Sequence, residues 1–578
     1  MTDILSVVDD GVDFDMLNLQ SFLPKDVAAH LDNLYDTSRK LFETLDFRVG
    51  AEARERGARP KHPVVLLPGI VSTGLESWTT SGKEGGYFRK RLWGSTTMVR
   101  NVLFDKENWV RHLTLNTTTG LDPSGIRVRA AQGLDAASYF AAGYWIWSKI
   151  IENLAAVGYD NTQVFLASYD WRLSMSNLQE RDHLYTRLKA HIETNTLMFK
   201  EKTVVVTHSM GATVGHYFLK WVEQEAGSEW VDTHIEAIVN IAGPMLGVPK
   251  AMGTLMTGEM RESVDVPLLL SRMLERFFSA AERTALFRSW AGAASMLMKG
   301  GDHVWGNLTS APDDPPDAAR TFGLLYQYAR APHTHEQPPR SSTEFTTDEA
   351  YPWLMEHAPP EFQRMIEMNY SLGFERDAAQ VKRNNRDERT WTNPLESALP
   401  NAPNLKMYCV YGWGKPTERG YWLRDAPVEY AMELGNATED NATRSANSTL
   451  SQRLTYRSRI DQDVHEPDAT PGVNVGCRVG EGDGTASLLS LGAMCVEGWK
   501  QPRYNPAGIK VVTHELQHKP DAFDIRGGAE TGDHVDILGS YGANDAVVRI
   551  ATGHGDEVQD HFVSQIRDYA KKIDWRGH

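Results

Sequence analysis

A serine lies in a pattern that suits nucleophilic catalysis. Three valines at 204–206 are followed by Thr207-His208-Ser209-Met210-Gly211, and the small residues continue into a helix-like stretch. A buried strand that turns sharply at a serine and enters a helix is the nucleophile elbow of α/β-hydrolases. The glycine usual two residues before the serine is Thr207 here, and His208 is expected to point away in a structural role. Ser209 is the predicted nucleophile, with a plain helix N-cap as the alternative.

Two downstream segments offer the carboxylate and the base in the chain order that this fold uses. Glycines flank Asp483 in the segment 480–485, so the backbone there is free to aim the carboxylate. A surface turn or a metal loop is the alternative, but the segment has too few spaced acids for a calcium loop, and we predict no metal. His534 is the predicted base, and His554 and His561 are its nearby rivals.

An oxyanion hole needs two backbone amides, one just after the nucleophile and one from an early strand–helix loop. The amide of Met210 is in the first position. The loop Leu67-Pro68-Gly69-Ile70 is placed to supply the second from Ile70. An ordinary Pro-Gly turn is the alternative interpretation of this loop.

Short apolar runs separated by helical stretches must position these residues. Because strands alternate with helices, the pattern predicts a mainly parallel sheet covered on both faces, the α/β-hydrolase arrangement with cap and lid insertions. The expected strands are 64–67, 164–166, 203–206, 237–241, 407–411 and 510–512, and the expected helices are 26–46, 143–157 and 212–226.

Changes in composition and hydrophobic periodicity along the chain predict four parts. Residues 1–60 are an acidic, helical arm, and 61–255 are the first part of the core with a cap insertion at about 75–125. Residues 256–400 read as a lid followed by an irregular insertion. Residues 401–578 are the second part of the core and carry the acid and the base.

Composition excludes some classes of function. The net charge of −16 argues against nucleic acid as a partner, because phosphate-binding surfaces need excess Lys and Arg. No window of about 18 to 20 apolar residues predicts a membrane span. The basic cluster Arg89-Lys90-Arg91 beside aromatic residues is either a solvated turn or a contact for anionic lipid headgroups.

Together these segments resemble the lecithin:cholesterol acyltransferase superfamily, and most closely its phospholipid:diacylglycerol acyltransferase branch. The resemblance covers most of residues 60–570. It rests on Leu67-Pro68-Gly69-Ile70, Ser168-Tyr169-Asp170-Trp171-Arg172, Thr207-His208-Ser209-Met210-Gly211, Leu246-Gly247-Val248-Pro249-Lys250-Ala251-Met252, Trp305-Gly306-Asn307, Gly482-Asp483-Gly484-Thr485 and Asp533-His534-Val535.

The resemblance implies a reaction and its partners. The expected enzyme moves a fatty acyl group from a phospholipid to diacylglycerol through an acyl-serine, giving triacylglycerol and lysophospholipid at a membrane surface without a cofactor. A phospholipase A-type hydrolase, a sterol acyltransferase and a non-catalytic lipid-binding protein stay open as alternatives.

The resemblance also implies structural features. Asp170 and Arg172 form a buried pair that braces the site. Cys409 and Cys495 form a disulfide, which would contribute roughly 4 kcal/mol in the chain-entropy model and leaves the state of Cys477 undecided. The resemblance also places a lid at about 256–300. Its apolar residues either face acyl chains or pack as a core helix pair. They are Met260, Leu268, Leu269, Met273, Phe277 and Phe278.

Two features point to a secretory compartment. Three cysteines allow one disulfide. Asn-x-Ser/Thr sequons start at Asn116, Asn307, Asn369, Asn436, Asn441 and Asn447, the last three clustered in a polar stretch. The expectation is an enzyme of the endoplasmic reticulum lumen, associated with the membrane by an N-terminal anchor that is absent from this chain.

Overall fold

A central sheet of six parallel strands forms the core of the protein. The computed structural model describes residues 48–141, 144–265, 278–328, 343–425 and 458–576. The spatial order of the strands is β17-β12-β9-β8-β1-β7, and every pair is parallel. The strands are β1 (Val64–Leu67), β7 (Val164–Leu166), β8 (Thr203–His208), β9 (Ile235–Ile241), β12 (Lys406–Trp413) and β17 (Lys510–Gln517).

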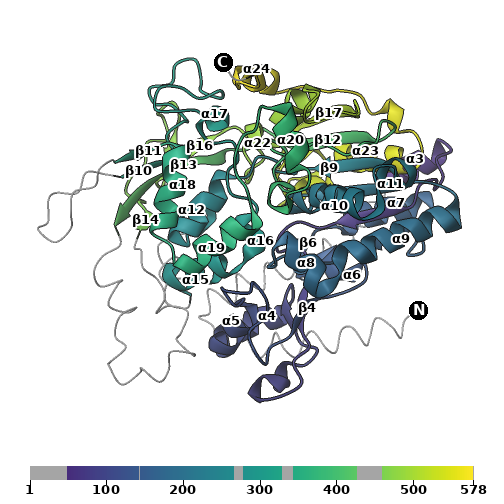
Figure 1. The fold of residues 1–578 in the computed structure, drawn as a ribbon, viewed down its shortest axis with the longest axis horizontal. Coiled ribbons are helices and arrows are strands. Elements are labelled where there is room, and N and C mark those ends of the chain that lie inside the picture. Colours follow the sequence, from purple (N-terminus) through teal and green to yellow (C-terminus); the bar gives the residue numbers. More distant parts are fainter. Residues whose placement is uncertain (1–47, 142–143, 266–277, 329–342, 426–457, 577–578) are drawn as a thin grey trace, which may run out of the picture.

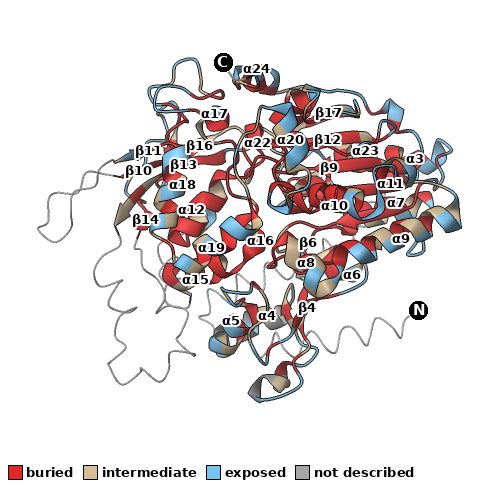
Figure 2. Cartoon of the chain, in the orientation of Figure 1, coloured by how far each residue is buried: buried red, intermediate tan, exposed pale blue. Residues whose placement is uncertain are grey.

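These six strands confirm the predicted α/β fold. Each predicted apolar run lies inside one of them, because a strand that is covered on both faces has apolar side chains at consecutive positions. Figure 2 shows this sheet as mostly buried, and all residues of β1 and β8 are buried.

Helices cover both faces of the sheet (Figure 1). The side chain of Thr207 lies against Gly215 of α10 (Met210–Ala226), whereas the ring of His208 lies 6.2 Å from that of Trp147, just before α7 (Ser148–Val157). Since neighbouring residues of a strand point to opposite faces, α10 and α7 lie on opposite sides. On the α7 side are also α3 (Arg48–Glu55) and α23 (Tyr541–Ala551). On the other side, α9 (Leu184–Phe199) and α11 (Trp230–His234) pack on α10. Helix α22 (Leu488–Val496) packs on β12 and β17.

A second sheet lies beside the first, at the left of Figure 1. Its strand order is β11-β10-β13-β16-β15, with β14 paired to β13. Residues 250–400, which include the expected lid and irregular insertion, are therefore more regular than their composition indicated, because they supply two of these strands and several helices. The strands are β10 (Tyr326–Tyr328), β11 (Glu344–Phe345), β13 (Thr417–Asp425), β14 (Ser458–Ile460), β15 (Val473–Asn474) and β16 (Cys477–Gly480).

Helices of the 250–400 stretch pack around this second sheet and along the core. The longest are α12 (Pro249–Thr257), α15 (Ala280–Ser289), α18 (Thr347–Glu356), α19 (Pro360–Asn369) and α20 (Ala378–Asn384). The same stretch also contains the short helices α13 (Arg261–Val264), α16 (Ala291–Ala294) and α17 (Gly301–Trp305). Elsewhere in the chain lie α6 (Asp135–Ser138), α8 (Met175–Asp182) and α24 (Ile566–Lys572).

The stretch expected to form a cap folds as a small unit at the bottom of Figure 1. It consists of β2 (Leu75–Ser77), β3 (Arg91–Trp93) and β4 (Val128–Ala130), with α4 (Thr96–Phe104) and α5 (Lys106–Leu113). The guanidinium of Arg89 lies 4.7 Å from the centre of the Trp78 ring, and the Lys90 ammonium lies 5.3 Å from that of Tyr87. Arg89 and Lys90 are nevertheless exposed, so the basic cluster is a solvated turn whose cations also lie over aromatic rings.

Several predicted features lie outside the described residues. They are the helix at 26–46, the lid residues Leu268, Leu269, Met273 and Phe277, and the sequons at Asn436, Asn441 and Asn447. Met260 and Phe278 are half-buried. Among the helices that the structure describes, none combines the length and the apolarity needed to cross a bilayer.

The structure contains the Cys409–Cys495 disulfide that the resemblance implied. It joins strand β12 to helix α22 across 86 residues of sequence, and the two Cα atoms lie 6.5 Å apart. Cys477 is a free, buried thiol in β16, and burial raises its pKa.

Candidate active site

Ser209 lies at the turn between β8 and α10 in a conformation that favours glycine. Its φ is 54° and its ψ is −129°, which is uncommon for a residue with a side chain. The first turn of α10 comes very close to β1, since a Cβ on Gly211 would lie 2.3 Å from the carbonyl oxygen of Leu67. Strand, strained serine and glycine together form the nucleophile elbow that the local sequence predicted.

The hydroxyl of Ser209 begins a chain of hydrogen bonds to a histidine and a carboxylate. Its Oγ lies 2.9 Å from His534 Nε2, and His534 Nδ1 lies 2.6 Å from Asp483 Oδ2. All three side chains are buried, with 6%, 5% and 0% of Ser209, His534 and Asp483 exposed. This is the hydrogen-bond geometry of a serine–histidine–carboxylate triad, with the imidazole between the hydroxyl and the carboxylate.

The acid loop holds Asp483 by hydrogen bonds from its own backbone. Asp483 Oδ1 accepts from the amides of Thr485 (3.0 Å) and Ala486 (2.7 Å), which leaves Oδ2 for the imidazole. The His534 amide donates to the Asp483 carbonyl (2.9 Å). Backbone and side-chain contacts therefore join the acid loop to the base loop.

Two ion pairs flank His534, and local sequence patterns did not predict them. Lys415 Nζ lies 2.5 Å from Asp533 Oδ2, and Arg526 Nε donates to Asp536 Oδ1 (2.5 Å). Burial opposes ionisation of Asp533, but Lys415 outweighs it and holds the pKa below its ordinary value. Burial raises the pKa of Asp536 to about 6, although Arg526 opposes this rise.

His208 points away from the hydroxyl and supports the base loop. Its Nε2 lies 2.8 Å from the carbonyl oxygen of His534, and since burial lowers its pKa to about 3, the neutral ring donates this hydrogen bond. The two rival histidines are engaged elsewhere. His554 lies 3.4 Å from Glu557, and the Nδ1 atom of His561 lies 2.8 Å from the Glu515 carbonyl.

The two expected oxyanion amides lie at the elbow. Met210 is the first residue of α10, and the amides at a helix start have no partner within the helix. The Pro68–Ile70 loop touches the serine, because a Cβ on Gly69 would lie 2.9 Å from Ser209 Cβ. The amides of Ile70 and Met210 donate no hydrogen bond to the residues that the structure describes. They are available to an oxyanion.

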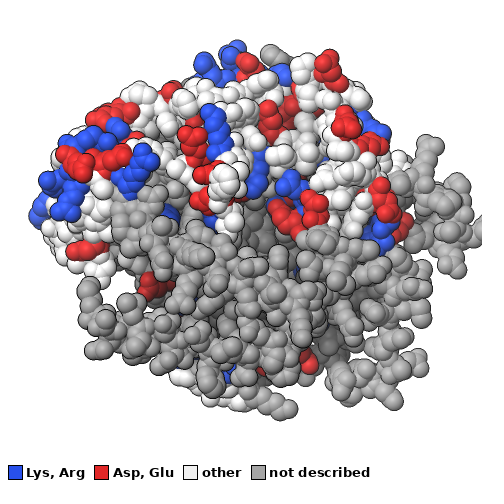
Figure 3. All heavy atoms as spheres, turned by 180° about the vertical axis from the view of Figure 1, so that it is seen from behind, with Lys and Arg blue, Asp and Glu red and all other residues white. Residues whose placement is uncertain are grey.

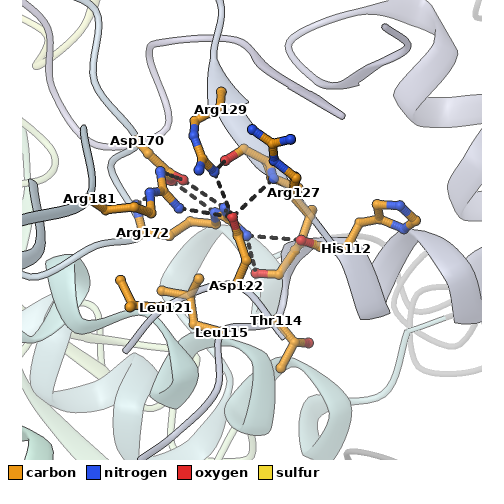
Figure 4. A network of polar contacts seen from close by, with 12 residues as sticks. His112, Thr114, Leu115, Leu121, Asp122, Arg127, Arg129, Asp170, Arg172 and Arg181 are labelled. Carbon is orange, nitrogen blue, oxygen red and sulfur yellow. Dashed lines mark hydrogen bonds and ion pairs between the residues drawn. The ribbon is translucent and has the colours of Figure 1, made fainter. Parts of the chain in front are cut away.

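Asp170 and Arg172 form the expected buried pair, at the centre of a larger network (Figure 4). Arg172 donates to both carboxylate oxygens of Asp170 (2.9 and 2.6 Å), and neither side chain is exposed. Arg181 also pairs with Asp170, and both arginines reach Asp122 in the cap. Burial opposes ionisation of Asp170, but Arg172 and Arg181 hold its pKa well below the ordinary value. The network joins the cap to the loop after β7.

The described part of one face of the molecule shows no basic patch for a polyanionic partner (Figure 3). On the described part of the face in Figure 3, Lys and Arg are interspersed with Asp and Glu. Within the described ranges, no group of three or more His, Cys, Asp or Glu side chains is placed to hold a metal ion.

The chain is similar to known lipid acyltransferases. Residues 87–541 match the family model "Lecithin:cholesterol acyltransferase". The phospholipid:diacylglycerol acyltransferase of Schizosaccharomyces pombe is 41% identical over 91% of this chain and 78% of its own length. That of Saccharomyces cerevisiae is 36% identical over 98% of this chain and 83% of its own length.

A phospholipid–sterol O-acyltransferase of Arabidopsis thaliana is more distant. It is 25% identical over 66% of this chain and 63% of its own length. The family model covers well over half of the chain, and the two yeast proteins match most of it. The chain therefore belongs to the lecithin:cholesterol acyltransferase family and is a lipid acyltransferase.

Proposed function

We propose that this chain moves a fatty acyl group from a phospholipid to diacylglycerol through an acyl-enzyme on Ser209. The observation that carries this proposal is the hydrogen-bonded series Ser209–His534–Asp483 at one edge of the parallel sheet. The similarity to the two yeast enzymes supports the choice of donor and acceptor.

The first half-reaction cleaves the donor. His534 Nε2 takes the hydroxyl proton as Ser209 Oγ attacks the ester carbonyl carbon of the phospholipid. The amides of Ile70 and Met210 donate to the oxyanion of the tetrahedral intermediate. When this intermediate collapses, the carbon–oxygen bond to the lysophospholipid breaks, and His534 gives its proton to the leaving oxygen.

The second half-reaction forms the product. The free hydroxyl of diacylglycerol loses its proton to His534 and attacks the acyl-serine carbonyl carbon. The bond from Ser209 Oγ to the acyl carbon then breaks, the serine oxygen regains a proton from His534, and triacylglycerol leaves. No nucleotide or other energy source enters, since one ester bond replaces another.

The alternatives differ in what accepts the acyl group. Transfer to a lipid requires an active site that limits competition from water, and the deep burial of the three side chains supports this. A sterol acceptor is less favoured, because the sterol acyltransferase relative is the more distant one. A non-catalytic lipid-binding role would leave the complete Ser209–His534–Asp483 series without a purpose.

We also propose a secretory compartment, the endoplasmic reticulum lumen, with the enzyme at a membrane surface. The Cys409–Cys495 disulfide supports an oxidising environment. The sequons at Asn116 and Asn307 are exposed. Asn369 is a poorer glycosylation site, since it is half-buried and its Nδ2 donates to the Met365 carbonyl (2.7 Å).

An assay with acyl-labelled phospholipid in micelles, with and without diacylglycerol, tests the proposal. We expect labelled triacylglycerol only when diacylglycerol is present, and Ser209→Ala should lower its rate by at least about 10⁴-fold. Ser228→Ala, at an exposed serine after α10, is the matched control and should keep full activity. Free fatty acid as the sole product would show a hydrolase, and turnover by the Ser209→Ala protein would exclude Ser209 as the nucleophile.

A further inference from the structure

A loop between β17 and His534 lies beside the active site and has no assigned role. The His518 amide donates to the Trp413 carbonyl at the end of β12 (2.7 Å), and the Gly532 amide donates back to His518 Nδ1 (3.1 Å). Both ends of the loop are therefore held at the carboxyl edge of the sheet, where Ser209 and His534 lie. Residues 519–527, called the rim loop below, project from this base.

The rim loop exposes two large apolar side chains. Phe523 is 99% exposed and Ile525 is 65% exposed. The loop nevertheless has a defined shape, because the amides of Phe523 and Arg526 donate to Asp521 Oδ1 (2.9 Å) and Asp524 Oδ1 (2.8 Å). The Asp521 amide also donates to the Gly527 carbonyl (3.0 Å). A structured loop thus holds apolar side chains out in solvent, where nothing in the described chain covers them.

The rim loop is connected to neighbouring parts of the active-site edge. The Arg526 guanidinium lies 4.1 Å from the ring centres of both Tyr144 and Trp145, on strand β6 (Tyr144–Trp145). The same guanidinium pairs with Asp536, two residues after His534. Tyr144 is itself 42% exposed. Phe523, Ile525 and Tyr144 therefore belong to one structural unit that borders the base loop.

Another exposed apolar pair lies at the opposite edge of the sheet and serves as a comparison. Leu197 and Met198, near the end of α9, are 70% and 63% exposed. The chain passes from there directly into the amino end of β8, whereas the rim loop follows the carboxyl end of β17. Both pairs are mostly exposed, but they lie at opposite ends of parallel strands.

We propose that the rim loop is an interfacial anchor that inserts Phe523 and Ile525 into a phospholipid bilayer next to the active site. This inference rests on the proposed function, because phospholipid and diacylglycerol reside in a bilayer and must reach Ser209 from it. Burying the two side chains in the acyl region removes apolar surface from water. The exposed side chains of Lys519 and Asp521 carry opposite charges that cancel. We therefore expect the anchor to bind an uncharged surface, with an affinity that changes little with salt concentration.

Vesicle binding by the full 578-residue chain tests the anchor. With phosphatidylcholine vesicles that contain diacylglycerol, the double variant Phe523→Ser/Ile525→Ser should bind about tenfold more weakly or worse than the unchanged protein, at low and at high salt. Leu197→Ser/Met198→Ser is the matched control and should bind normally. Phe523→Leu/Ile525→Val keeps the apolar surface and should also bind normally.

A second measurement separates this inference from the proposed function. Turnover of a water-soluble short-chain ester needs Ser209 but no bilayer, so the anchor variant should keep its rate while Ser209→Ala loses it. The anchor is refuted if the serine variant of the rim loop binds vesicles normally, if the α9 control loses binding equally, or if the apolar variant binds as weakly as the serine variant. Failure of soluble-ester turnover in the unchanged protein would instead count against the proposed function.

Discussion

At the residue scale, Lys415 links the two loops that carry the acid and the base. Its backbone amide donates to the Gly482 carbonyl (3.0 Å), beside Asp483, and its Nζ pairs with Asp533, beside His534. Its stem passes over Gly484, where a Cβ would lie 2.8 Å from Lys415 Cδ. Lys415 therefore touches neither the hydroxyl nor the imidazole, but it is placed to position both loops.

Lys415→Met should change the pH profile as well as the rate. We expect kcat to fall by about tenfold with little change in KM, because the base loop loses a tie that lies away from the bound substrate. The Asp533 carboxylate then keeps its hydrogen bonds from the Val535 and Asp536 amides but loses its ion pair. Its negative charge lies beside His534, where the other charged or titratable neighbours are Asp483, Asp536, Arg526 and His208. The midpoint of the acidic limb of the kcat/KM profile should shift to higher pH by about half a pH unit. A shift of this size is expected when one nearby positive charge is removed in a partly solvated site.

Two controls distinguish this positioning role from general damage. Lys415→Met combined with Asp533→Asn removes both charges, so the acidic limb should return toward its original position. Lys500→Met removes an exposed partner of Glu497 (3.2 Å) and should change nothing. An acidic limb that does not move in Lys415→Met would show that the ion pair has no electrostatic effect on the base.

The sequence could predict which residues form the candidate active site, but it could not predict the residues that support them. Ser209, Asp483 and His534 carry local signals: a strand before a serine, glycines around an acid, and the chain order of the fold. Lys415 and Asp533 are 118 residues apart, and nothing near either residue identifies the other. Such pairs follow from the tertiary fold, which brings the β12–β13 connection against the base loop.

At the element scale, burial decided which strands were predictable. The strands of the central sheet are covered on both faces and read as apolar runs, so all six were predicted. The second sheet was missed because every strand in it except the nine-residue β13 is short and their partners are distant in the sequence. Tyr326 of the three-residue β10, for example, pairs with Tyr421 of β13. Neither strand has a pattern that reveals such a partner.

The approach of α10 to β1 leads to a prediction for Gly211. A Cβ there would meet the carbonyl oxygens of Leu67 and Pro68 at 2.3 and 2.6 Å, so Gly211→Ala must push the Pro68–Ile70 loop away from the helix. Because this displaces one proposed oxyanion donor, kcat should fall by about 10²-fold or more with a smaller change in KM. Steady-state kinetics on the soluble ester would show this.

Gly86→Ala is the matched control for this substitution, since nothing lies within 4 Å of a Cβ built at Gly86. Its activity should be unchanged. If Gly211→Ala instead raised KM and left kcat intact, the close contact would matter for substrate binding and not for the oxyanion.

At the scale of the whole molecule, a buried lysine lies where the 250–400 stretch meets the core. Lys299 is fully buried. Among the described residues, its Nζ donates a hydrogen bond only to the Met245 carbonyl (3.4 Å), and no carboxylate pairs with it. Its amide donates to the Leu246 carbonyl (2.9 Å), and its own carbonyl accepts from Trp305 Nε1 (2.8 Å). The backbone around Lys299 stabilises this junction, whereas burial of its ammonium group opposes it.

Burial lowers the pKa of Lys299 to about 7, from 10.5 for an unperturbed lysine. Between these values the unfolded chain binds a proton that the folded chain does not, so this group makes the free energy of unfolding rise with pH. Below pH 7 both states are protonated and the full cost of burying the charge remains. From pH 7 to pH 9 the contribution of Lys299 amounts to roughly 2 kcal/mol.

Lys299→Met should remove that pH dependence and stabilise the protein most at or below pH 7, because methionine fills similar space without a charge. Denaturant unfolding at pH 6, 7 and 9 measures the effect. We expect the variant to gain a few kcal/mol at pH 6, of order 4, and progressively less toward pH 9. Lys382→Met, at an exposed position of α20, should leave all three values unchanged. A Lys299→Met protein that gains equally at every pH would show that packing, not charge burial, sets the cost at this junction.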